Sequence, residues 1–501
     1  MAKEKETGKA KPDAGKAKTE QGKGTEQTLA LTVTKAGDFT EWYQQLIQKA
    51  ELADYTSVSG CMVLRPNAYS IWEGIQAEFN KKIKKTGHRN VYFPLFIPEH
   101  LFEKEKEHVE GFEPEVAWVE SAGNTKLEER LAIRPTSETI FYESYAKWIR
   151  SHRDLPLLLN QWVNIVRWEF KHPRPFIRTR EFLWQEGHTA HATKEEAEKE
   201  ALMILKDYTD LIENFLAIPV LSGQKSESEK FPGADYTLTM EALMPNGKAL
   251  QMGTSHMLGQ NFSKPFDIKF LDEKSAEQFA WQTSWGISTR LIGAMAMVHG
   301  DDKGLVVPPK IAERKVVIVP IFFEKSKTQV LEKCAELEKR LERFGAFVDS
   351  DENHSPGFKF HQWEMQGIPV RIEVGPRDIE KKQFIAVRRD SGEKAAVNEG
   401  DAEKEIEGML EKMQEALFKK AKEFLDKNTV EVKDKASFVK AIEDGKMAFG
   451  FFCESAECEA NIKAETQATS RLIPLEQKET GGKCFFCGAA AKRKSYFARN
   501  Y

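Results

Sequence analysis

The sequence is poor in cysteine, in long apolar runs and in excess charge of either sign. Its 501 residues include six cysteines, and 74 basic against 78 acidic residues leave a net charge of -4. So few cysteines in a chain of this length exclude a disulfide scaffold. No apolar run reaches the length of a membrane span, so we expect a cytoplasmic protein without membrane contact. Because there is no global basic field, any contact with RNA must come from local patches.

The length predicts several domains. A chain of 501 residues is too long for one typical core, and two to four domains are expected. Residues 1–27 consist mainly of Lys, Glu, Gly, Ala and Thr with little to bury, which predicts a disordered charged tail. After about residue 310, buried-type strands alternate with charged helices, which indicates a small α/β domain with a mainly parallel sheet. We therefore expect units at 28–310, 311–410 and 411–501.

The first unit begins with two amphipathic patterns. Residues 39–53 have apolar positions at helical spacing, and a long helix is expected from Pro66 to Gly87. A strand is expected at residues 90–96, where Pro94 suggests an edge or interface position. A long helix feeding such a strand could form a dimer interface, although packing within its own domain is equally compatible. The apolar positions expected to face inward on the long helix are Ile71, Trp72, Ile75, Phe79 and Ile83.

Residues 166–182, with the sequence VRWEFKHPRPFIRTREF, are unusually rich in arginine. We interpret them as two strands joined by a basic loop, with Arg167 and Glu169 on one face because alternate strand residues point the same way. Guanidinium groups bind phosphate oxygens in a bidentate fork, and the ring of Phe182 could stack on a purine. Taken alone, the stretch fits an ordinary hairpin with a charged face equally well.

Three other short motifs place polar groups where a ligand could meet them. In RPTSE, Thr136 and Glu138 offer an acceptor pair for an ammonium group, although locally a helix N-cap is the favoured interpretation. Small residues around His256 permit close backbone approach to a ligand, but a lone histidine could also be a satisfied core residue. Arg290 follows a glycine turn at the start of a helix, where it could reach a phosphate or simply lie on the surface.

Four cysteines crowd the end of the chain with the spacing C-x4-C, a gap, and C-x2-C. In a cytosolic protein two close cysteine pairs predict tetrahedral thiolate ligation of zinc. Four thiolates leave no open position, so the expected zinc is structural. The predicted ligands are Cys453, Cys458, Cys484 and Cys487.

The order of these motifs resembles a class II aminoacyl-tRNA synthetase, specifically the prolyl-tRNA synthetase family of the archaeal and eukaryotic type. The resemblance covers roughly residues 30–501. The helix and strand ending at Pro94 resemble the first class signature, VRWE with RTREF the second, and the segment ending in Arg290 the third. RPTSE resembles the proline-binding loop, PGFKF with GPRD the anticodon-binding domain, and the cysteine segment the C-terminal zinc domain. The stretch 182–286 is too short for the large editing insertion of the bacterial type.

This resemblance implies an α+β multidomain fold. It consists of a class II catalytic core with an antiparallel sheet and helices, an α/β anticodon-binding domain and a small zinc-binding C-terminal α/β domain. The implied protein is a homodimer that takes ATP with Mg²⁺, L-proline and tRNA(Pro). It forms prolyl-adenylate and pyrophosphate, and then transfers the prolyl group to the 3′ end of the tRNA.

The resemblance also assigns roles to individual residues. Arg167 and Arg290 would be catalytic, with Arg167 holding both the α-phosphate and the proline carboxylate, and Gln251 would face Mg²⁺. Ser288 is a less regular ATP contact because the third signature keeps one glycine before its arginine. Proline would be bound by Thr136, Glu138, Arg167 and His256, with Phe112 and Glu115 closing over it. ATP would be bound by Arg167, Glu169, Arg178, Thr179, Phe182, Gln251, Thr254, Ser288 and Arg290. The anticodon would be bound by Lys359, Glu373, Arg377 and Asp378.

Two other functions compete with this interpretation. A threonyl or histidyl class II synthetase would share the core and a similar anticodon domain, but the RPTSE loop combined with the C-terminal cysteines disfavours it. A synthetase-like RNA-binding protein without catalysis should have lost the charges of the ATP site. Arg167, Glu169, Arg178 and Arg290 are all present, which disfavours that alternative.

Overall fold

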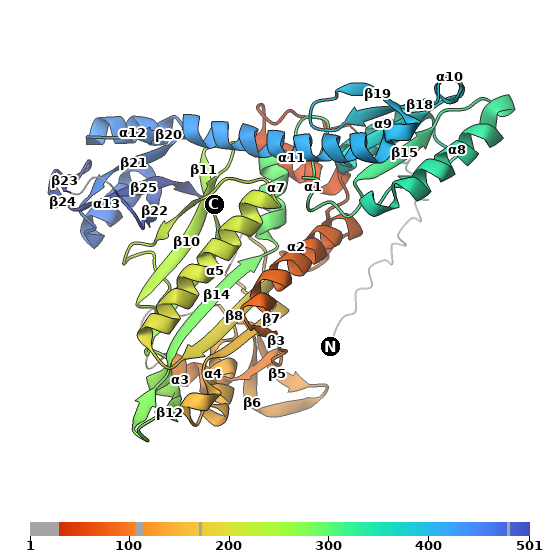
Figure 1. Cartoon of the computed structure of the whole chain (residues 1–501). Coiled ribbons are helices and arrows are strands. Elements are labelled where there is room, and N and C mark those ends of the chain that lie inside the picture. The colour runs from red at the N-terminus through yellow and green to blue at the C-terminus, as the bar shows by residue number, and fades with distance from the viewer. Residues whose placement is uncertain (1–29, 107–114, 170–172, 478–480) are drawn as a thin grey trace, which may run out of the picture.

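The computed structural model describes residues 30–106, 115–169, 173–477 and 481–501 (Figure 1). The expected tail, residues 1–27, and Phe112 lie outside the described residues. Within the described ranges, no helix is both long enough and apolar enough to cross a membrane.

An eleven-stranded sheet forms the centre of the molecule. Its middle strands run antiparallel from β9 through β10, β11, β14 and β8 to β7, which confirms the expected class II core. The strand order, with bounds, is β20 (Thr429–Glu431), β21 (Met447–Phe452), β25 (Arg493–Asn500), β22 (Ala468–Pro474), β9 (Leu221–Gln224), β10 (Tyr236–Leu243), β11 (Lys248–Gly259), β14 (Trp281–Ser288), β8 (Glu181–His191), β7 (Leu157–Val166) and β3 (Arg89–Asn90).

Two long helices cover one face of this sheet. They are α2 (Pro66–Lys85) and α5 (Lys194–Asn214), and Figure 1 shows α5 lying across the strands. All five apolar positions predicted to face inward on α2 are buried. The ring of Phe79 stacks on Tyr208 at 4.8 Å and meets Trp285 edge-on at 6.0 Å. A Cβ at Gly187 would lie 2.2 Å from the Trp285 ring, so only glycine fits beneath this aromatic layer.

Shorter elements surround the sheet. The expected strand at residues 90–96 is wrong: the chain leaves the sheet after Asn90 and pairs again only from Phe96, because prolines interrupt a strand ladder. The remaining elements of this part are α1 (Phe39–Lys49), β1 (Ala53–Tyr55), β2 (Met62–Leu64), β4 (Phe96–Pro98), α3 (Glu99–Lys106), β5 (Trp118–Ala122), β6 (Thr125–Ile133), α4 (Glu138–Trp148), η1 (His152–Asp154), α6 (Ser263–Phe266), β12 (Lys269–Leu271), β13 (Glu277–Phe279) and α7 (Arg290–His299).

A second, five-stranded sheet has the order β16 (Phe347–Val348), β15 (Val316–Pro320), β17 (Val370–Val374), β18 (Gln383–Arg388) and β19 (Lys394–Asn398). The first three strands are parallel, but β18 and β19 are antiparallel, so the expectation of a mainly parallel sheet is wrong. The helix between β17 and β18 has five residues, which is too short for a crossover. That five-residue helix is α10 (Pro376–Glu380), and the other helices of this part are η2 (Glu324–Ser326), α8 (Lys327–Arg340), η3 (Glu342–Phe344), α9 (Pro356–Gln366) and η4 (Glu399–Asp401).

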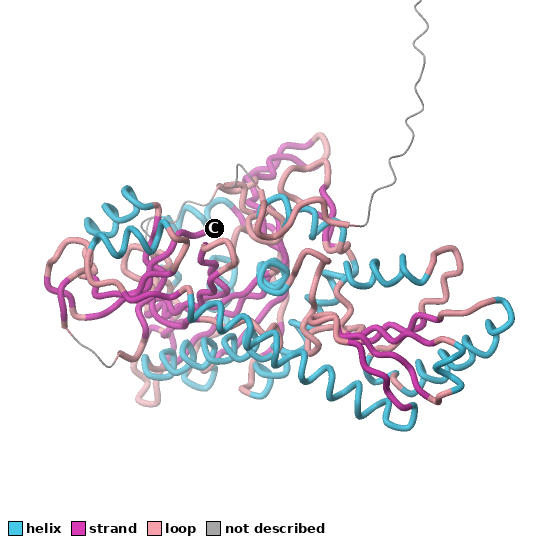
Figure 2. Tube along the Cα trace, turned by 90° about the horizontal axis from the view of Figure 1, so that it is seen from above, coloured by secondary structure: helices cyan, strands magenta, loops and turns pink. Residues whose placement is uncertain are grey.

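One long helix, α11 (Ala402–Lys427), links the second sheet to the last part of the chain (Figure 2). Ile406 packs in the core of the second sheet. Further along the helix, Met413 and Leu417 pack with Ala217 and Val306, which belong to the expected unit 28–310. The expected boundary at 410/411 therefore falls inside a continuous helix. The last part also contains α12 (Lys435–Glu443), α13 (Ala456–Thr466), β23 (Gly482–Lys483) and β24 (Ala490–Ala491).

Candidate active site

A cavity of about 450 Å³ opens on the face of the central sheet that α5 leaves uncovered. On β8, Gln185 is bonded to Tyr208 of α5, so Trp184, Glu186 and His188 point to the opposite face and line the cavity. Twelve residues expected from the sequence also line it: Thr136, Glu138, Arg167, Glu169, Arg178, Thr179, Phe182, Gln251, Thr254, His256, Ser288 and Arg290.

The arginine-rich stretch 166–182 joins two antiparallel strands, as expected, but it contains only the end of one and the start of the other, so the connection is longer than expected. β7 ends at Val166 and β8 begins at Glu181. Arg167 therefore follows the first strand directly, and its N–H donates to the carbonyl of Arg180 at 2.7 Å. Arg167 and Glu169 do not lie in a strand, so strand alternation does not place them on one face. The turn still brings both residues to the cavity.

Arg167 lies between aromatic rings and carboxylates. Its Nε donates to the Pro135 carbonyl at 3.0 Å, and its Cζ lies 5.3 Å from the Trp184 ring centre. Burial lowers the pKa of Arg167, opposed by the negative charges of Glu169, Glu138 and Glu186. The guanidinium is thus oriented before any ligand arrives.

Arg290 begins α7, and its side chain crosses the cavity wall. Its two terminal nitrogens donate to the carbonyls of Gln251 at 3.2 Å and Ile177 at 3.3 Å. Burial, followed by the positive charges of Arg178 and Arg167, lowers the pKa of Arg290 to about 10. Because Arg178 and Arg167 lie close enough to lower the pKa of Arg290, this part of the cavity is a cationic region suited to a polyanion.

Arg178 lies on the exposed side of the same region. Its guanidinium donates to the main-chain oxygen of Tyr501, and the Tyr501 N–H donates to the Ala249 carbonyl at 3.3 Å. The last described residue thereby lies beside the arginines of the cavity.

Carboxylates gather at the other end of the cavity. The Thr136 hydroxyl donates to the Glu138 carboxylate, while Ser137 donates to Glu186 at 2.5 Å and Gln161 to the same oxygen at 2.6 Å. Ser137 occupies the N-cap position of α4 without making a side-chain cap bond. The N-cap position and the acidic first turn are as expected, but the side-chain cap bond is absent because the hydroxyls donate to the carboxylates instead.

His256 is a half-buried, hydrogen-bonded residue of the cavity wall. Its Nδ1 lies 2.9 Å from the Thr237 hydroxyl, and its Nε2 lies 3.0 Å from that of Thr254. Burial, together with the nearby His188, lowers the pKa of His256 to about 3. The imidazole is therefore neutral at physiological pH and does not repel a cationic ligand.

Several cavity residues lie outside the motifs recognised in the sequence: Trp184, Glu186, His188, Lys225 and Phe231. The acidic and imidazole groups of Glu138, Glu186 and His188 lie within 4.8 Å of one another. The alternation W-Q-E-G-H along β8 was the available signal, since it places aromatic, acidic and basic groups on one face.

Glu115 is not among the residues that line the cavity. Its side chain is exposed, and its main-chain oxygen accepts from the Trp168 N–H at 3.0 Å. This contact brings the Glu115 backbone next to the turn that carries Arg167.

The four anticodon candidates lie on the second sheet and its helices. Lys359 and Glu373 are buried, and they form ion pairs with Asp349 at 3.1 Å and Arg371 at 2.9 Å respectively. Arg377 is exposed on α10, and Asp378 accepts from the backbone N–H that precedes this helix. Among these four, Arg377 has the side chain most open to a partner.

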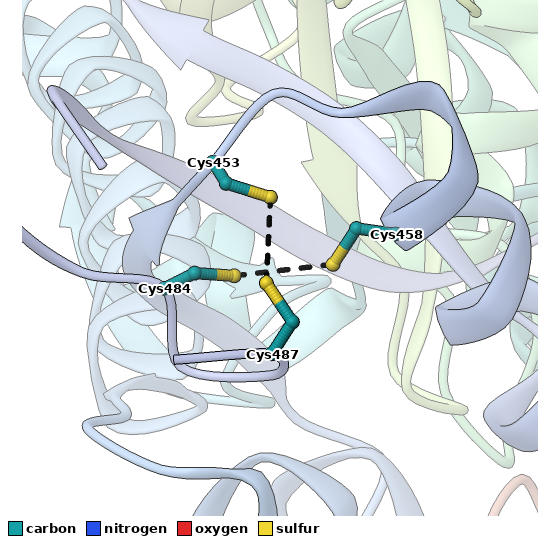
Figure 3. A group of neighbouring side chains, drawn as sticks. All are labelled: Cys453, Cys458, Cys484 and Cys487. Atoms are coloured by element: carbon teal, nitrogen blue, oxygen red, sulfur yellow. Dashed lines mark hydrogen bonds between the residues drawn. The ribbon is translucent and has the colours of Figure 1, made fainter. Parts of the chain in front are cut away.

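The four C-terminal cysteines converge, as Figure 3 shows. Cys458 and Cys484 have their sulfurs 3.9 Å apart, and those of Cys453 and Cys487 are 3.7 Å apart. Thiolates placed tetrahedrally about 2.3 Å from a zinc ion would be about 3.8 Å apart. The donor set and spacing fit such an ion.

Three family models match successive parts of the chain. A "tRNA synthetase class II core domain (G, H, P, S and T)" matches residues 118–299, and an "Anticodon binding domain" matches residues 315–409. A "Prolyl-tRNA synthetase, C-terminal" model matches residues 436–501.

Curated relatives match nearly the whole chain. The proline--tRNA ligase of Natranaerobius thermophilus is 50% identical over 96% of this chain and 100% of its own length. The chain belongs to the prolyl-tRNA synthetase family. The proline--tRNA ligase of Cenarchaeum symbiosum, also a member of the family, is 50% identical over 94% of this chain and 100% of its own.

A solved structure of the family has the same fold. The crystal structure of prolyl-tRNA synthetase from Cryptosporidium parvum complexed with halofuginone and AMPPNP gives a TM-score of 0.90 at 48% identity. It covers 94% of this chain and 100% of that one. The predicted family and fold class are thereby confirmed, and the threonyl and histidyl alternatives are excluded.

The hydrogen-bonded His256 of the cavity wall should make the protein sensitive to acid. In the unfolded chain the His256 imidazole has a pKa near 6.5, whereas in the folded state its pKa is about 3. Between these values the unfolded state binds more protons, so stability falls as the pH falls, by about 2 kcal/mol at about pH 5. Thermal unfolding across this range should show a shallower pH dependence for His256→Gln. The exposed-site control His361→Gln should behave as the wild type, and an unchanged slope in His256→Gln would contradict the assignment.

Proposed function

We propose that this chain activates L-proline with ATP to prolyl-adenylate and transfers the prolyl group to the 3′ end of tRNA(Pro). The observation that carries the proposal is a single cavity with opposite charge at its two ends. Arg178 and Arg290 lie at one end, Glu138 and Glu186 lie at the other, and Arg167 stands between them. This polarity matches a polyanionic nucleotide and a secondary ammonium.

In the first step an oxygen of the proline carboxylate attacks the α-phosphate in line. The new O–P bond replaces the bond to the leaving pyrophosphate. Such a reaction gains most from positioning and from stabilising the charge that develops on phosphate oxygens. Arg167 lies between the two ends of the cavity and is proposed to hold both the carboxylate and the α-phosphate. Its bond to the Pro135 carbonyl fixes the orientation of the fork.

The proline ammonium is proposed to lie against Thr136 and Glu138. Glu138 keeps a carboxylate oxygen toward the cavity, and Glu186 adds a second negative charge close by. The proline ring would pack beside His256, whose neutral state avoids repulsion of the ammonium, and beside Phe231. The ring centres of His256 and Phe231 are 4.7 Å apart. A pocket for a small apolar ring excludes smaller amino acids poorly.

ATP is proposed to occupy the arginine-rich end. Phe182 would stack on adenine and Glu169 would accept from its amino group, while Arg178 and Arg290 would hold the β- and γ-phosphates. Thr179, Thr254 and Ser288 would complete the wall. Mg²⁺, when bound with ATP, neutralises phosphate charge, and Gln251 is the proposed protein residue facing it. The transfer step needs the terminal ribose of tRNA to enter the same cavity.

The second sheet is proposed to bind the anticodon. Exposed Arg377 on α10 offers a guanidinium for bases splayed from a loop. Asp378, Glu373 and Lys359 are proposed to shape the same surface, the last two from buried ion pairs.

We also propose the archaeal and eukaryotic type, a cytoplasmic location and units at 28–310, 311–410 and 411–501. The type is supported by the short stretch between β8 and β14, which leaves no space for a large inserted domain, and by the C-terminal cysteines. Similar ligases come from bacteria as well as from an archaeon, so the type rests on this architecture. The cytoplasmic location is supported by the tRNA substrate.

Amino-acid-dependent ATP–pyrophosphate exchange tests the activity. The wild type should exchange with proline, and not with threonine or histidine. Arg167→Ala should reduce exchange by at least about a thousandfold, because the variant no longer holds the proline carboxylate or the α-phosphate. Binding of tRNA by Arg167→Ala should stay within about twofold, measured by filter binding. Absence of proline-dependent exchange in the wild type would refute the function, and loss of both properties in the variant would refute separate sites.

One structural zinc ion is proposed for the cysteine cluster. Elemental analysis of the purified protein should find about one zinc per chain. Cys458→Ser should release the metal and lower the thermal midpoint, since metal binding is coupled to folding. Cys334→Ser, at a buried cysteine of the second sheet's core, should keep its zinc. A metal content near zero in the wild type would refute the site.

A homodimer is proposed through the face that carries β3, β4 and the end of α4. Large apolar side chains are exposed there: Tyr92, Phe96 and Trp148. Light scattering should give about twice the monomer mass. The double variant Tyr92→Arg with Phe96→Glu should be monomeric, whereas Phe323→Glu, at an exposed phenylalanine before η2, should remain dimeric. A monomeric wild type would contradict the proposal.

A further inference from the structure

A buried group of three charges joins the C-terminal strands to the cavity wall. Glu241 on β10 accepts from Lys225 Nζ at 2.7 Å and from Arg471 Nη2 at 2.8 Å. All three side chains are at most 4% exposed. Thr469 accepts from Arg471 Nη1 at 2.9 Å and so orients the guanidinium. We call these residues, Lys225, Glu241 and Arg471, the charge bridge.

The charge bridge has two positive charges against one negative charge. Burying a surplus charge is unfavourable unless another charge compensates it. Lys225 lines the cavity, so its surplus charge acts on whatever occupies the cavity. The backbone of Glu241 lies opposite Gln251 in the sheet, and the Gln251 carbonyl accepts from Arg290. At Arg290 the charges of Glu241 and Arg471 act with opposite sign, so Arg471 offsets the negative charge of Glu241 at the arginine-rich end.

The C-terminal part of the chain also fixes the backbone around Lys225. β22 pairs with β9 at Ile473 and Gln224, directly before Lys225. A Cβ at Gly223 would lie 2.4 Å from the Ile473 oxygen, so the two strands meet closely there. On the other side, the Ser226 hydroxyl donates to Glu459 at 2.9 Å.

We propose that Arg471 is a positioning residue for adenylate formation, supplied to the catalytic cavity by the C-terminal strands. Through Glu241 it holds Lys225 in the cavity wall and leaves a net positive charge there for the phosphates of ATP. Arg471 itself touches no cavity surface and acts through its partners. This inference rests on the proposed function.

Loss of Arg471 has a definite electrostatic consequence. With methionine at this position, Glu241 would pair with Lys225 alone and the surplus charge would disappear. The phosphate end would then attract ATP less strongly. Thr136, Glu138 and His256 do not contact the charge bridge through any hydrogen bond of the described residues, so proline binding should be preserved.

The test is steady-state ATP–pyrophosphate exchange by the full chain, with ATP and proline varied separately. Arg471→Met should raise the KM for ATP roughly tenfold while changing the KM for proline by less than about twofold. Arg471→Lys keeps the charge and should restore most of the ATP affinity. Arg493→Met removes another arginine of the C-terminal part, whose Nε bonds Glu454 at 2.9 Å, and should leave both KM values unchanged.

The outcomes separate this inference from the proposed function. If the wild type exchanges with proline and Arg471→Met has an unchanged KM for ATP, the inference is overturned while the function stands. Equal increases in both KM values would also overturn it, because they indicate general loosening of the fold. If Arg471→Met does not fold, the decision passes to Thr469→Val, which keeps the charge but removes the bond that orients the guanidinium. A raised KM for ATP with an unchanged KM for proline in Thr469→Val would then support the inference, and an unchanged KM for ATP would overturn it.

Discussion

The register of four antiparallel strands is the constraint on which the active site depends. His188, Ser284, His256 and Thr237 lie opposite one another on β8, β14, β11 and β10, and form one row across the sheet. The next row contains Glu186, Gly286, Thr254 and Thr239, and Trp184 lies opposite Ser288 in a third. A slip of one residue in any strand would turn its members of these rows toward α5.

These rows also order the cavity by charge. The histidine row lies at the end where the carboxylates gather, and the row with Ser288 adjoins Arg290. Gly286 stands in the middle row, where the absence of a side chain leaves room for a ligand between the two ends. Because charges of opposite sign are held apart by the sheet, the proposed sites would bring a zwitterionic amino acid and a polyphosphate together with their reacting groups adjacent. A neutral His256 suits this proposal, since its protonation would place a cation beside the proposed ammonium site.

Local sequence chemistry predicted the cavity residues better than it predicted their secondary structure. Thr136, Glu138, Arg167 and Arg290 each had an ordinary structural explanation, and they were identifiable because the order and spacing of their motifs resemble the family signatures. The strand assignment around Arg167 failed because β-prone residues also occur in an ordered connection, which here is held by tertiary contacts such as the Tyr43 hydroxyl on the Pro175 carbonyl at 2.8 Å. Glu186 and His188 were missed because their role requires knowledge of which face of β8 is covered.

The continuity of the central sheet could not be predicted from sequence, because strand pairing over more than 200 residues leaves no local signal. β22 covers the edge of β9, and β25 runs parallel to the start of β11. Without these partners β9 would be an exposed edge strand with unpaired backbone groups, and it leads directly into Lys225. The C-terminal part therefore completes the catalytic sheet in addition to holding its cysteine cluster. Since α13 carries both Cys458 and Glu459, and Glu459 bonds Ser226 beside Lys225, the order of the cysteine cluster and the geometry of the cavity wall are mechanically connected through one helix.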